Sequence, residues 1–249
     1  MEYSFKNKKV LVTGSSNGIG KEIAKQFLNY GAKVIGVSRG NFHLEGDYTH
    51  FEQDLVKNDS SNKIVDFLNN KNLFPLDVVI HNAGGTMNIS NPFCGMNEWK
   101  KVMRLNFEHI VELNEKILPS MVKNKYGRVV HISSISAMEN HGPVTYCSAK
   151  AALTAYTRSM GGVVAPDGVV MTAVLPGAVF DKGNFWDEKQ KNDPSHVHKY
   201  LTERQRIGRF GTTKEIADLV IFLSSEFSSF CTGSIVPIDG GQGRGYFGQ

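Results

Sequence analysis

A short apolar run that breaks directly into a glycine-rich turn limits the possible folds of this chain more than any other part of it. Residues 9–13, Lys-Val-Leu-Val-Thr, are typical of a buried strand, and the amphipathic stretch Lys21–Tyr30 predicts a helix. Between them, Gly14 permits a tight turn, Gly18 lets backbone approach a pyrophosphate, and Gly20 lets the helix pack close to the strand. Because a helix N-terminus presents free N–H groups and a positive dipole end, this order predicts a phosphate cradle.

The rest of the chain continues the alternation of strand and helix. The spacing G-x-x-x-G-x-G is a weak sign when it stands alone, but it is stronger at the first strand of a series. Further strands are predicted at Val34–Val37, Val78–Ile80, Val129–Ile132, Met171–Leu175 and Ile235–Ile238. Further helices are predicted at Ser60–Asn69, Asn97–Asn124, Val144–Val164 and Thr213–Leu223. We therefore expect an α/β fold in one domain, 1–249: a doubly wound, Rossmann-like, mostly seven-stranded parallel sheet with helices on both faces.

Two predicted helices contain residues that disfavour helical structure, and one long segment shows no periodicity. Pro119 should kink the helix over 97–124 or mark its last turns, and Gly161-Gly162 weakens the end of the next helix. The segment Phe180–Ile207 is rich in Lys, His, Asn and Asp. Long irregular segments in compact domains are commonly lids or binding loops, so we expect 180–207 to be a loop that covers the substrate. A disordered, solvated loop is the alternative.

Composition and charge exclude several classes of protein. A net charge of +4 arises from 28 basic and 24 acidic residues with no run of like charge, so nucleic acid is not an expected partner. Cys94, Cys147 and Cys231 have no C-x-x-C spacing, which favours neither a disulfide framework nor a zinc site. The first strand leaves no room for a signal peptide, and no apolar run has the length of a membrane span. We expect a cytoplasmic protein without a membrane partner.

Tyr146 and Lys150 are the pair of side chains with the most direct chemical meaning. They are four residues apart in a predicted helix, so they lie on the same face. An ammonium about 4 Å from a phenol supplies roughly 4 kcal/mol at an effective dielectric of about 20, enough to lower the phenol pKa by about three units. In water the gain is only about 1 kcal/mol. Within a cleft the pair would be an acid–base device with a depressed Tyr146 pKa, and on the surface it would be a solvated Lys beside a Tyr.

Five motifs in this order resemble those of the short-chain dehydrogenase/reductase family, and the resemblance covers nearly the whole chain. They are Thr13-Gly-Ser-Ser-Asn-Gly-Ile-Gly20, Asn82-Ala-Gly84, Tyr146-Cys-Ser-Ala-Lys150, Pro176-Gly177 and Asp239-Gly-Gly241. The resemblance implies hydride transfer between a nicotinamide cofactor and a carbonyl or hydroxyl carbon. It also implies a homotetramer or homodimer, because the helices that contain Asn106 and Tyr146 commonly form the family's subunit interfaces.

The resemblance also implies catalytic roles. Tyr146 would exchange a proton with the substrate oxygen, and Lys150 would stabilise the phenolate and bond the nicotinamide ribose. The backbone of Asn106 would hold a water that links Lys150 to solvent, although a satisfied helical Asn is the simpler interpretation without the resemblance.

A serine hydroxyl would hold the substrate oxygen, and two serines compete for this role. Counting thirteen residues back from Tyr146 gives Ser133, whereas aligning the strand from Gly127-Arg128 gives Ser134. Successive strand residues face opposite sides, so one of the two should point into the cleft. We favour Ser134, because loop lengths vary more easily than strand register.

Cofactor preference depends on the end of the second strand. Ser38 occupies the position where a carboxylate would bond the ribose 2′-hydroxyl of NAD, and Arg39, which can clamp a 2′-phosphate, follows. NADP(H) is therefore favoured over NAD(H), although Asn17 stands where NADP-using relatives often carry Lys or Arg. Asp54 matches the family's adenine contact or caps a helix. The cofactor-binding residues implied are Gly14, Ser16, Asn17, Gly18, Ile19, Gly20, Ser38, Arg39, Asp54, Leu55, Asn82, Ala83, Gly84, Tyr146, Lys150, Pro176, Gly177 and Val179.

The sequence departs from the family near the nicotinamide. Asp181 stands close to the family's usual Thr, and Thr172 where Asn is usual, so contacts to the nicotinamide amide are less secure than those to the phosphates. No metal is expected, because the histidines lack ligand spacing and acidic neighbours: His131, His141, His196 and His198.

The expected function is that of an NADP(H)-dependent oxidoreductase acting on the carbonyl or secondary hydroxyl of a small molecule. A sugar or nucleotide-sugar oxidoreductase is one alternative, since the basic residues between Lys182 and Arg206 favour a polar or anionic substrate, unless they are simply solvated. A non-catalytic, nucleotide-sensing protein on the same fold is another. Such proteins can lose the Tyr or Lys, whereas this chain keeps both.

Overall fold

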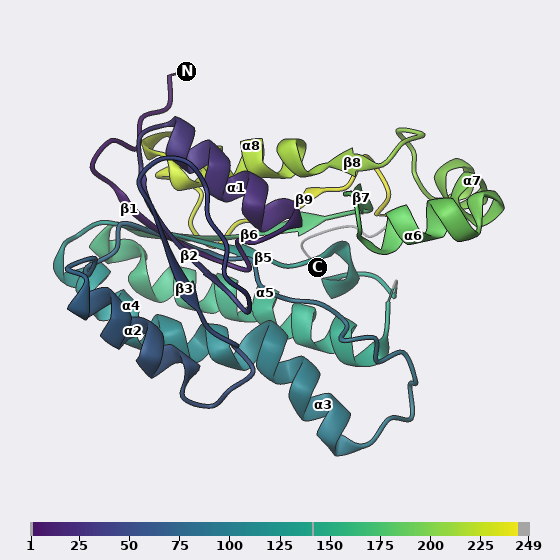
Figure 1. Ribbon diagram of the computed structural model, residues 1–249, viewed down its shortest axis with the longest axis horizontal. Helices are drawn as coiled ribbons and strands as arrows, with labels where there is room; N and C mark the ends of the chain where they lie inside the picture. Colours follow the sequence, from purple (N-terminus) through teal and green to yellow (C-terminus); the bar gives the residue numbers. More distant parts are fainter. Residues whose placement is uncertain (1, 141, 244–249) are drawn as a thin grey trace.

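Seven parallel strands form the central sheet, in the order β3-β2-β1-β4-β5-β6-β9 (Figure 1). The computed structural model describes residues 2–140 and 142–243, so His141 lies outside the described residues. The strands are β1 Lys9–Thr13, β2 Lys33–Ser38, β3 Tyr48–Glu52, β4 Val78–His81, β5 Gly127–Ile132, β6 Val169–Pro176 and β9 Ile235–Ile238. From β1 the chain adds strands toward one edge and from β4 toward the other, so the expected doubly wound parallel sheet is confirmed.

Helices cover both faces of the sheet. They are α1 Gly18–Asn29, α2 Ser60–Asn70, α3 Met96–Met103, α4 His109–Lys123, α5 Val144–Val164, α6 Phe185–Asn192, α7 Pro194–Glu203 and α8 Thr213–Ser224. Figure 1 shows α1 and α8 on one face and α2, α4 and α5 on the other. The shorter elements are η1 Arg104–Glu108, η2 Ile135–Ala137, η3 Ala165–Asp167 and η4 Glu226–Ser228, and β7 Val179–Phe180 pairs with β8 Gly211–Thr212. Within the described part of the chain, every helix is too short or too polar to cross a membrane.

Alternate residues of each central strand supply two hydrophobic cores. In β1, Val10 and Val12 belong to the core beneath α1 and α8, whereas Leu11 belongs to the core beneath α2 and α4. Ile23 and Phe27 of α1 are completely buried in the first core. Since both faces of the sheet are covered, its inner strands are continuous apolar runs, which explains why the sequence predicts them.

The helix predicted over 97–124 is interrupted by a π-helical turn. This turn, η1, joins α3 to α4 and contains Asn106. The Asn106 amide donates to the carbonyl oxygens of Val102 and Gly85 (2.9 Å each), and its Oδ1 accepts from the Gly85 N–H at 2.9 Å. Because two of these bonds reach a distant loop, helical periodicity alone does not predict the turn. Pro119 lies in the last turns of α4.

The prediction that residues 180–207 lack regular structure is wrong, because α6 and α7 occupy most of the segment. The Asn184 side chain accepts hydrogen bonds from the first N–H groups of α6, and Asp193 accepts one from the His196 N–H at the start of α7 (3.1 Å). The ring of Trp186 in α6 packs 4.3 Å from that of Tyr200 in α7. Such short, polar helices depend on caps and tertiary packing rather than on a long apolar stripe.

Candidate active site

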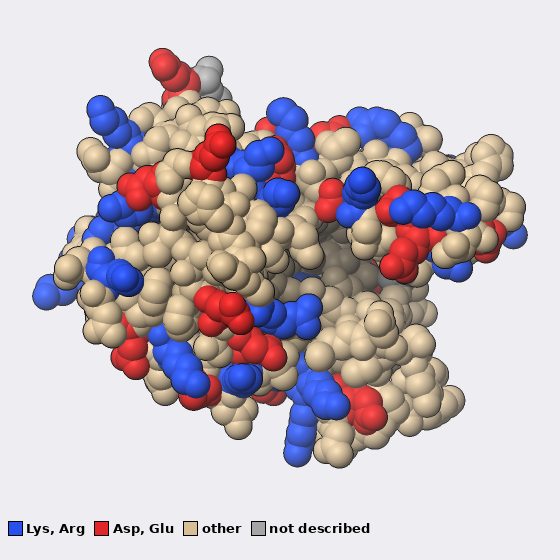
Figure 2. Space-filling model, in the orientation of Figure 1, with Lys and Arg blue, Asp and Glu red and all other residues tan. Residues whose placement is uncertain are grey.

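Two adjoining cavities open at the carboxyl ends of the central strands, where strand order reverses between β1 and β4. Figure 2 shows the molecule hollowed between the part that contains α6 and α7 and the part that contains α3. The first cavity, of about 500 Å³, contains eleven of the predicted site residues: Asn17, Gly18, Ile19, Asn82, Gly84, Ser134, Tyr146, Lys150, Pro176, Gly177 and Val179. The second, of about 800 Å³, adds Gly14, Ser16, Ser38, Arg39, Asp54, Leu55 and Ala83. Gly20 and Asn106 line neither cavity.

The turn after β1 is shaped by close backbone approach. Gly14 has a φ of +68°, and a Cβ on Gly20 would lie 2.2 Å from the Gly14 carbonyl oxygen. The Asn82 amide donates to the carbonyl oxygens of Thr13 and Gly14 at 3.1 Å each. The Thr13 hydroxyl in turn accepts from the backbone N–H groups of Asn82 and Ala83, a role that sequence reasoning missed. The Asn82-Ala-Gly84 motif therefore fixes the shape of the turn.

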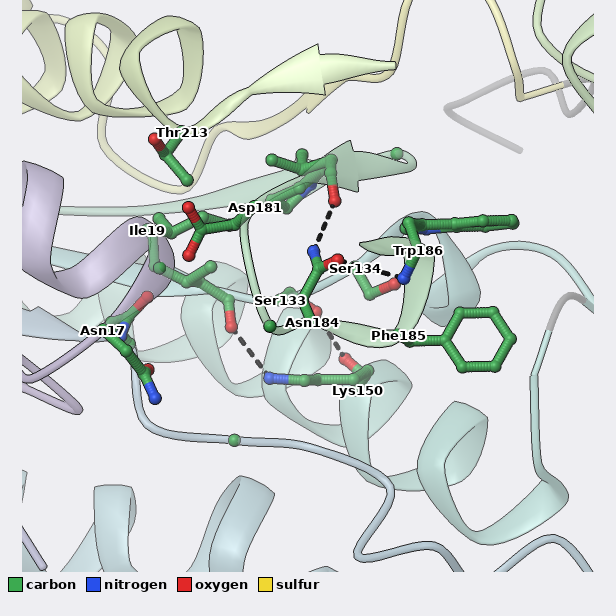
Figure 3. A pocket seen from close by; sticks show the side chains of 18 of the residues that line it. Asn17, Ile19, Ser133, Ser134, Lys150, Asp181, Asn184, Phe185, Trp186 and Thr213 are labelled. Carbon is green, nitrogen blue, oxygen red and sulfur yellow. Dashed lines mark hydrogen bonds between the residues drawn. The ribbon is translucent and has the colours of Figure 1, made fainter. Parts of the chain in front are cut away.

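This turn fits a pyrophosphate. α1 begins at Gly18, and the side chain of Asn17 makes no capping hydrogen bond to the helix. The first N–H groups of α1 therefore have no side-chain cap that would compete with an anion. Gly18 is also close to the opposite wall, since a Cβ there would lie 3.6 Å from the Asp181 carboxylate. Figure 3 shows Asp181 beside Ile19, so a carboxylate lies next to the predicted phosphate cradle.

The far end of the second cavity is lined by the predicted ribose-binding residues. The Ser38 hydroxyl donates to the Gly40 carbonyl oxygen at 3.1 Å. Arg39 is exposed and, among the described residues, forms no ion pair or hydrogen bond through its side chain. The Asp54 carboxylate accepts from the Val56 N–H at 3.1 Å, so it orders its own turn while lining the cavity. Arg39 thus supplies an uncompensated cation at this end.

The two candidate serines have different partners. The Ser133 side chain is 4% exposed and donates to the Lys150 carbonyl oxygen at 3.2 Å. Ser134 forms a side-chain hydrogen bond with Tyr146, and its oxygen also accepts from the Ser136 N–H at 3.1 Å. Figure 3 shows both serines and Lys150 around one pocket. Ser134 is therefore the serine whose hydroxyl meets the Tyr146 phenol.

Lys150 is buried beneath this pocket, 2% exposed, and its amine donates to the Ile132 carbonyl oxygen at 2.8 Å (Figure 3). The amine lies 5.7 Å from the centre of the Tyr146 ring. A Cβ on Gly84 would be 2.9 Å from the Lys150 amine and 2.8 Å from the Asn106 Oδ1. Lys150 and Asn106 thus approach the same glycine, and Asn106 supports the site from behind the cavity wall.

The expectation of a depressed Tyr146 pKa is wrong in this geometry. Burial raises the pKa of Tyr146 to about 12, and the hydrogen bond from Ser134 only partly opposes the rise. Burial also lowers the pKa of Lys150 to about 7. Desolvation penalises the charged form of both groups, and the Lys150 amine is directed to a backbone carbonyl. At neutral pH the site therefore holds a protonated phenol above an amine that readily gains or loses a proton.

Comparisons with known proteins agree with this geometry. A family model described as short chain dehydrogenase matches residues 8–192. The 3-oxoacyl-[acyl-carrier-protein] reductase of Buchnera aphidicola subsp. Schizaphis graminum is 33% identical over 243 residues, which cover 94% of this chain and 96% of the relative. The enzyme of the same name from Aquifex aeolicus is 32% identical over 254 residues, covering 97% and 99%.

Solved structures give the same fold. A 3-oxoacyl (acyl-carrier-protein) reductase from Agrobacterium tumefaciens C58 with NADP bound superposes with a TM-score of 0.88 at 27% identity and covers 96% of both chains. The L-sorbose reductase of Gluconobacter frateurii, complexed with NADPH and L-sorbose, has a TM-score of 0.88 at 24% identity, covering 97% of this chain and 98% of that one. At that identity the second likeness concerns the fold alone.

Proposed function

This chain belongs to the short-chain dehydrogenase/reductase family, and from that premise we propose that it is an NADPH-dependent reductase of small ketones. It is an oxidoreductase that transfers hydride between a nicotinamide cofactor and a carbonyl or secondary hydroxyl carbon. Three expectations stay predictions: location in the cytoplasm, assembly into a homotetramer or homodimer, and a single domain with a substrate-covering segment at 180–207.

The arrangement of Ser134, Tyr146 and Lys150 around one cavity carries the proposal. The residues of the glycine turn and of the two adjoining cavities would hold the nicotinamide cofactor, which would supply hydride for the carbonyl carbon in the reductive direction. The Ser134 hydroxyl holds the carbonyl oxygen, and the Tyr146 phenol gives it a proton. A phenol whose pKa is raised to about 12 keeps its proton at neutral pH, which supports the role of general acid. Lys150, with a pKa of about 7, can return a proton to Tyr146.

Preference for NADPH over NADH is supported by the ribose end of the second cavity. Ser38 stands there in place of an acidic residue, and the Arg39 guanidinium has no carboxylate partner among the described residues. A 2′-phosphate would give this guanidinium a bidentate partner, while a 2′-hydroxyl would not. The relative from Agrobacterium tumefaciens binds NADP, which agrees with this preference.

The experiment that tests the proposal follows nicotinamide absorbance with NADPH or NADH and a 3-oxoacyl thioester, chosen because the relatives are named 3-oxoacyl-[acyl-carrier-protein] reductases. We expect kcat/KM to be higher with NADPH. Arg39→Ala should reduce the NADPH value about tenfold or more, because a charge-assisted hydrogen bond contributes roughly 1.5–3 kcal/mol. Arg158→Ala, in α5 and away from both cavities, is the matched control. Equal kcat/KM values for the two cofactors in the parent enzyme would contradict the preference.

A further inference from the structure

A third cavity, of about 540 Å³, lies beside Ser134 and beneath α7. It shares Ser134, Pro176, Gly177 and Trp186 with the cavity that contains Lys150, so the two cavities adjoin. No residue of the glycine turn lines this third cavity. It therefore offers room for the part of a substrate that extends away from the reacting carbonyl, rather than for the dinucleotide.

One face of α7 forms the outer wall of this cavity. The lining residues are His196, Lys199, Tyr200, Glu203 and Arg204. The first four belong to α7, and Arg204 is the residue that caps its C-terminal end. Their spacing of three and four residues places all five side chains on the same side. The direction of α7, rather than the chance position of one long side chain, brings two cations to the cavity.

Aromatic packing and one amide hold this face of α7 in position. The Tyr200 ring lies 4.3 Å from that of Trp186, which lies 4.8 Å from Phe210. The Gln242 amide donates to the Tyr200 hydroxyl, and its Oε1 accepts from the Ala178 N–H at 3.0 Å. Since Ala178 directly follows the Pro176-Gly177 wall, these contacts fix α7 relative to the reaction centre.

The two cations on this wall are not neutralised. Among the described residues, Lys199 and Arg204 form no ion pair, whereas Lys191 before them pairs with Asp187 at 2.7 Å. Burial raises the pKa of Tyr200 and the positive charge of Arg204 partly opposes the rise, which indicates that this charge lies near the Tyr200 hydroxyl. Glu203 is the single carboxylate among the described lining residues, so positive charge is in excess.

From this arrangement we propose that the cavity beneath α7 is an anion subsite, in which Lys199 and Arg204 bind a carboxylate or phosphate group of the ketone substrate. A guanidinium binds either oxyanion through two parallel N–H groups, and an ammonium adds a point charge. Trp186 and Tyr200 cover the carbon chain between the anion and the carbonyl. The inference rests on the proposed function, because it takes Ser134 as the group that holds the carbonyl oxygen.

Matched pairs of ketones test the subsite. Acetoacetate is compared with methyl acetoacetate, and dihydroxyacetone phosphate with dihydroxyacetone, so that carboxylate and phosphate are distinguished. In at least one of the two pairs, we expect kcat/KM for the anionic ketone to exceed that for the neutral ketone about tenfold or more. Lys199→Gln and Arg204→Gln should each lower this ratio severalfold. Lys189→Gln and Arg206→Gln, which remove cations outside the cavity, should leave it unchanged.

Calorimetry separates the subsite from the chemistry. Binding of 3-hydroxybutyrate is measured against its methyl ester, in the parent protein and in the Lys199→Gln, Arg204→Gln double variant. Turnover without preference for either anion overturns the subsite and leaves the proposed function standing. Anion binding that requires both cations, without turnover of any ketone, supports the subsite and overturns the proposed function. Neither binding nor turnover overturns both.

Discussion

Two halves of the cleft are built in different ways: the cofactor half, which is the glycine turn at residues 14–20 with the second cavity, and the substrate half, which is α6 and α7 with the third cavity. Around the glycine turn, shape depends on backbone: Gly14 adopts a positive φ, and a Cβ on Gly20 would meet a carbonyl oxygen at 2.2 Å. Around α6 and α7, shape depends on side chains, such as the Trp186 and Tyr200 rings and the Gln242 amide. A surface fixed by backbone tolerates few substitutions. A surface fixed by side chains can change its ligand while the fold is kept, which fits a common cofactor and varied substrates.

Tyr146→Phe has the largest expected effect, because Tyr146 lies where the two halves of the cleft meet and is the proposed proton donor. The variant keeps the ring but loses the proton donor, so kcat should fall about 10²- to 10⁴-fold. Steady-state turnover of the best ketone measures the loss, and a thermal melt confirms that the protein is folded. Ser133→Ala is the control, because its hydroxyl bonds the Lys150 backbone rather than Tyr146. A loss smaller than tenfold would exclude Tyr146 as the general acid.

Acid should destabilise the core under the cofactor half. His81 is buried with its Nε2 2.8 Å from the Asn114 Oδ1, and His109 is buried nearby. Burial lowers the pKa of His81 from 6.5 to about 4 and that of His109 to about 3. Below pH 6.5 the unfolded chain therefore binds protons that the folded chain does not. The stability that these two neutral histidines contribute is fully present above pH 6.5, and it is lost as the pH falls toward 4.

Urea unfolding at pH 7 and pH 5 measures this effect. The two histidines together should reduce the free energy of unfolding by roughly 4 kcal/mol across that interval, at about 1.4 kcal/mol per pKa unit. His198→Gln removes an exposed imidazole of the substrate half and should leave the pH dependence unchanged. Equal free energies at the two pH values would show that these imidazoles are not buried as neutral groups.

Gly36→Ala tests how rigid the cofactor half is. Gly36 lies in β2, and a Cβ there would be 1.9 Å from the Tyr48 hydroxyl oxygen and 2.5 Å from the Ser15 Oγ. Overpacking of this kind costs about 1–3 kcal/mol in unfolding free energy, which chemical denaturation measures. Gly162→Ala is the matched control: a Cβ there meets nothing within 4 Å, and Ala favours the helix. If both variants were equally stable, the backbone of the cofactor half would be more adaptable than we infer.

The strands and the glycine turn were predictable because their causes are local. The run Val10-Leu11-Val12 is apolar on both sides, and both sides of β1 are buried. The break at Arg104–Glu108 was not predictable, because the bonds that Asn106 makes to Gly85 join segments 21 residues apart. The same reason applies to α7, where Gln242 reaches back 42 residues to Tyr200.

The pattern of residues by itself determined a doubly wound α/β fold, a tight glycine turn after β1 and the placement of Tyr146 and Lys150 on one helix, because strand burial, glycine geometry and helical spacing depend on neighbouring residues. Tertiary structure alone decided which serine meets the phenol, that Lys199 and Arg204 line the third cavity, and in which direction the Tyr146 pKa moves. These properties depend on desolvation and on the relative placement of segments far apart in the chain, which local spacing does not specify.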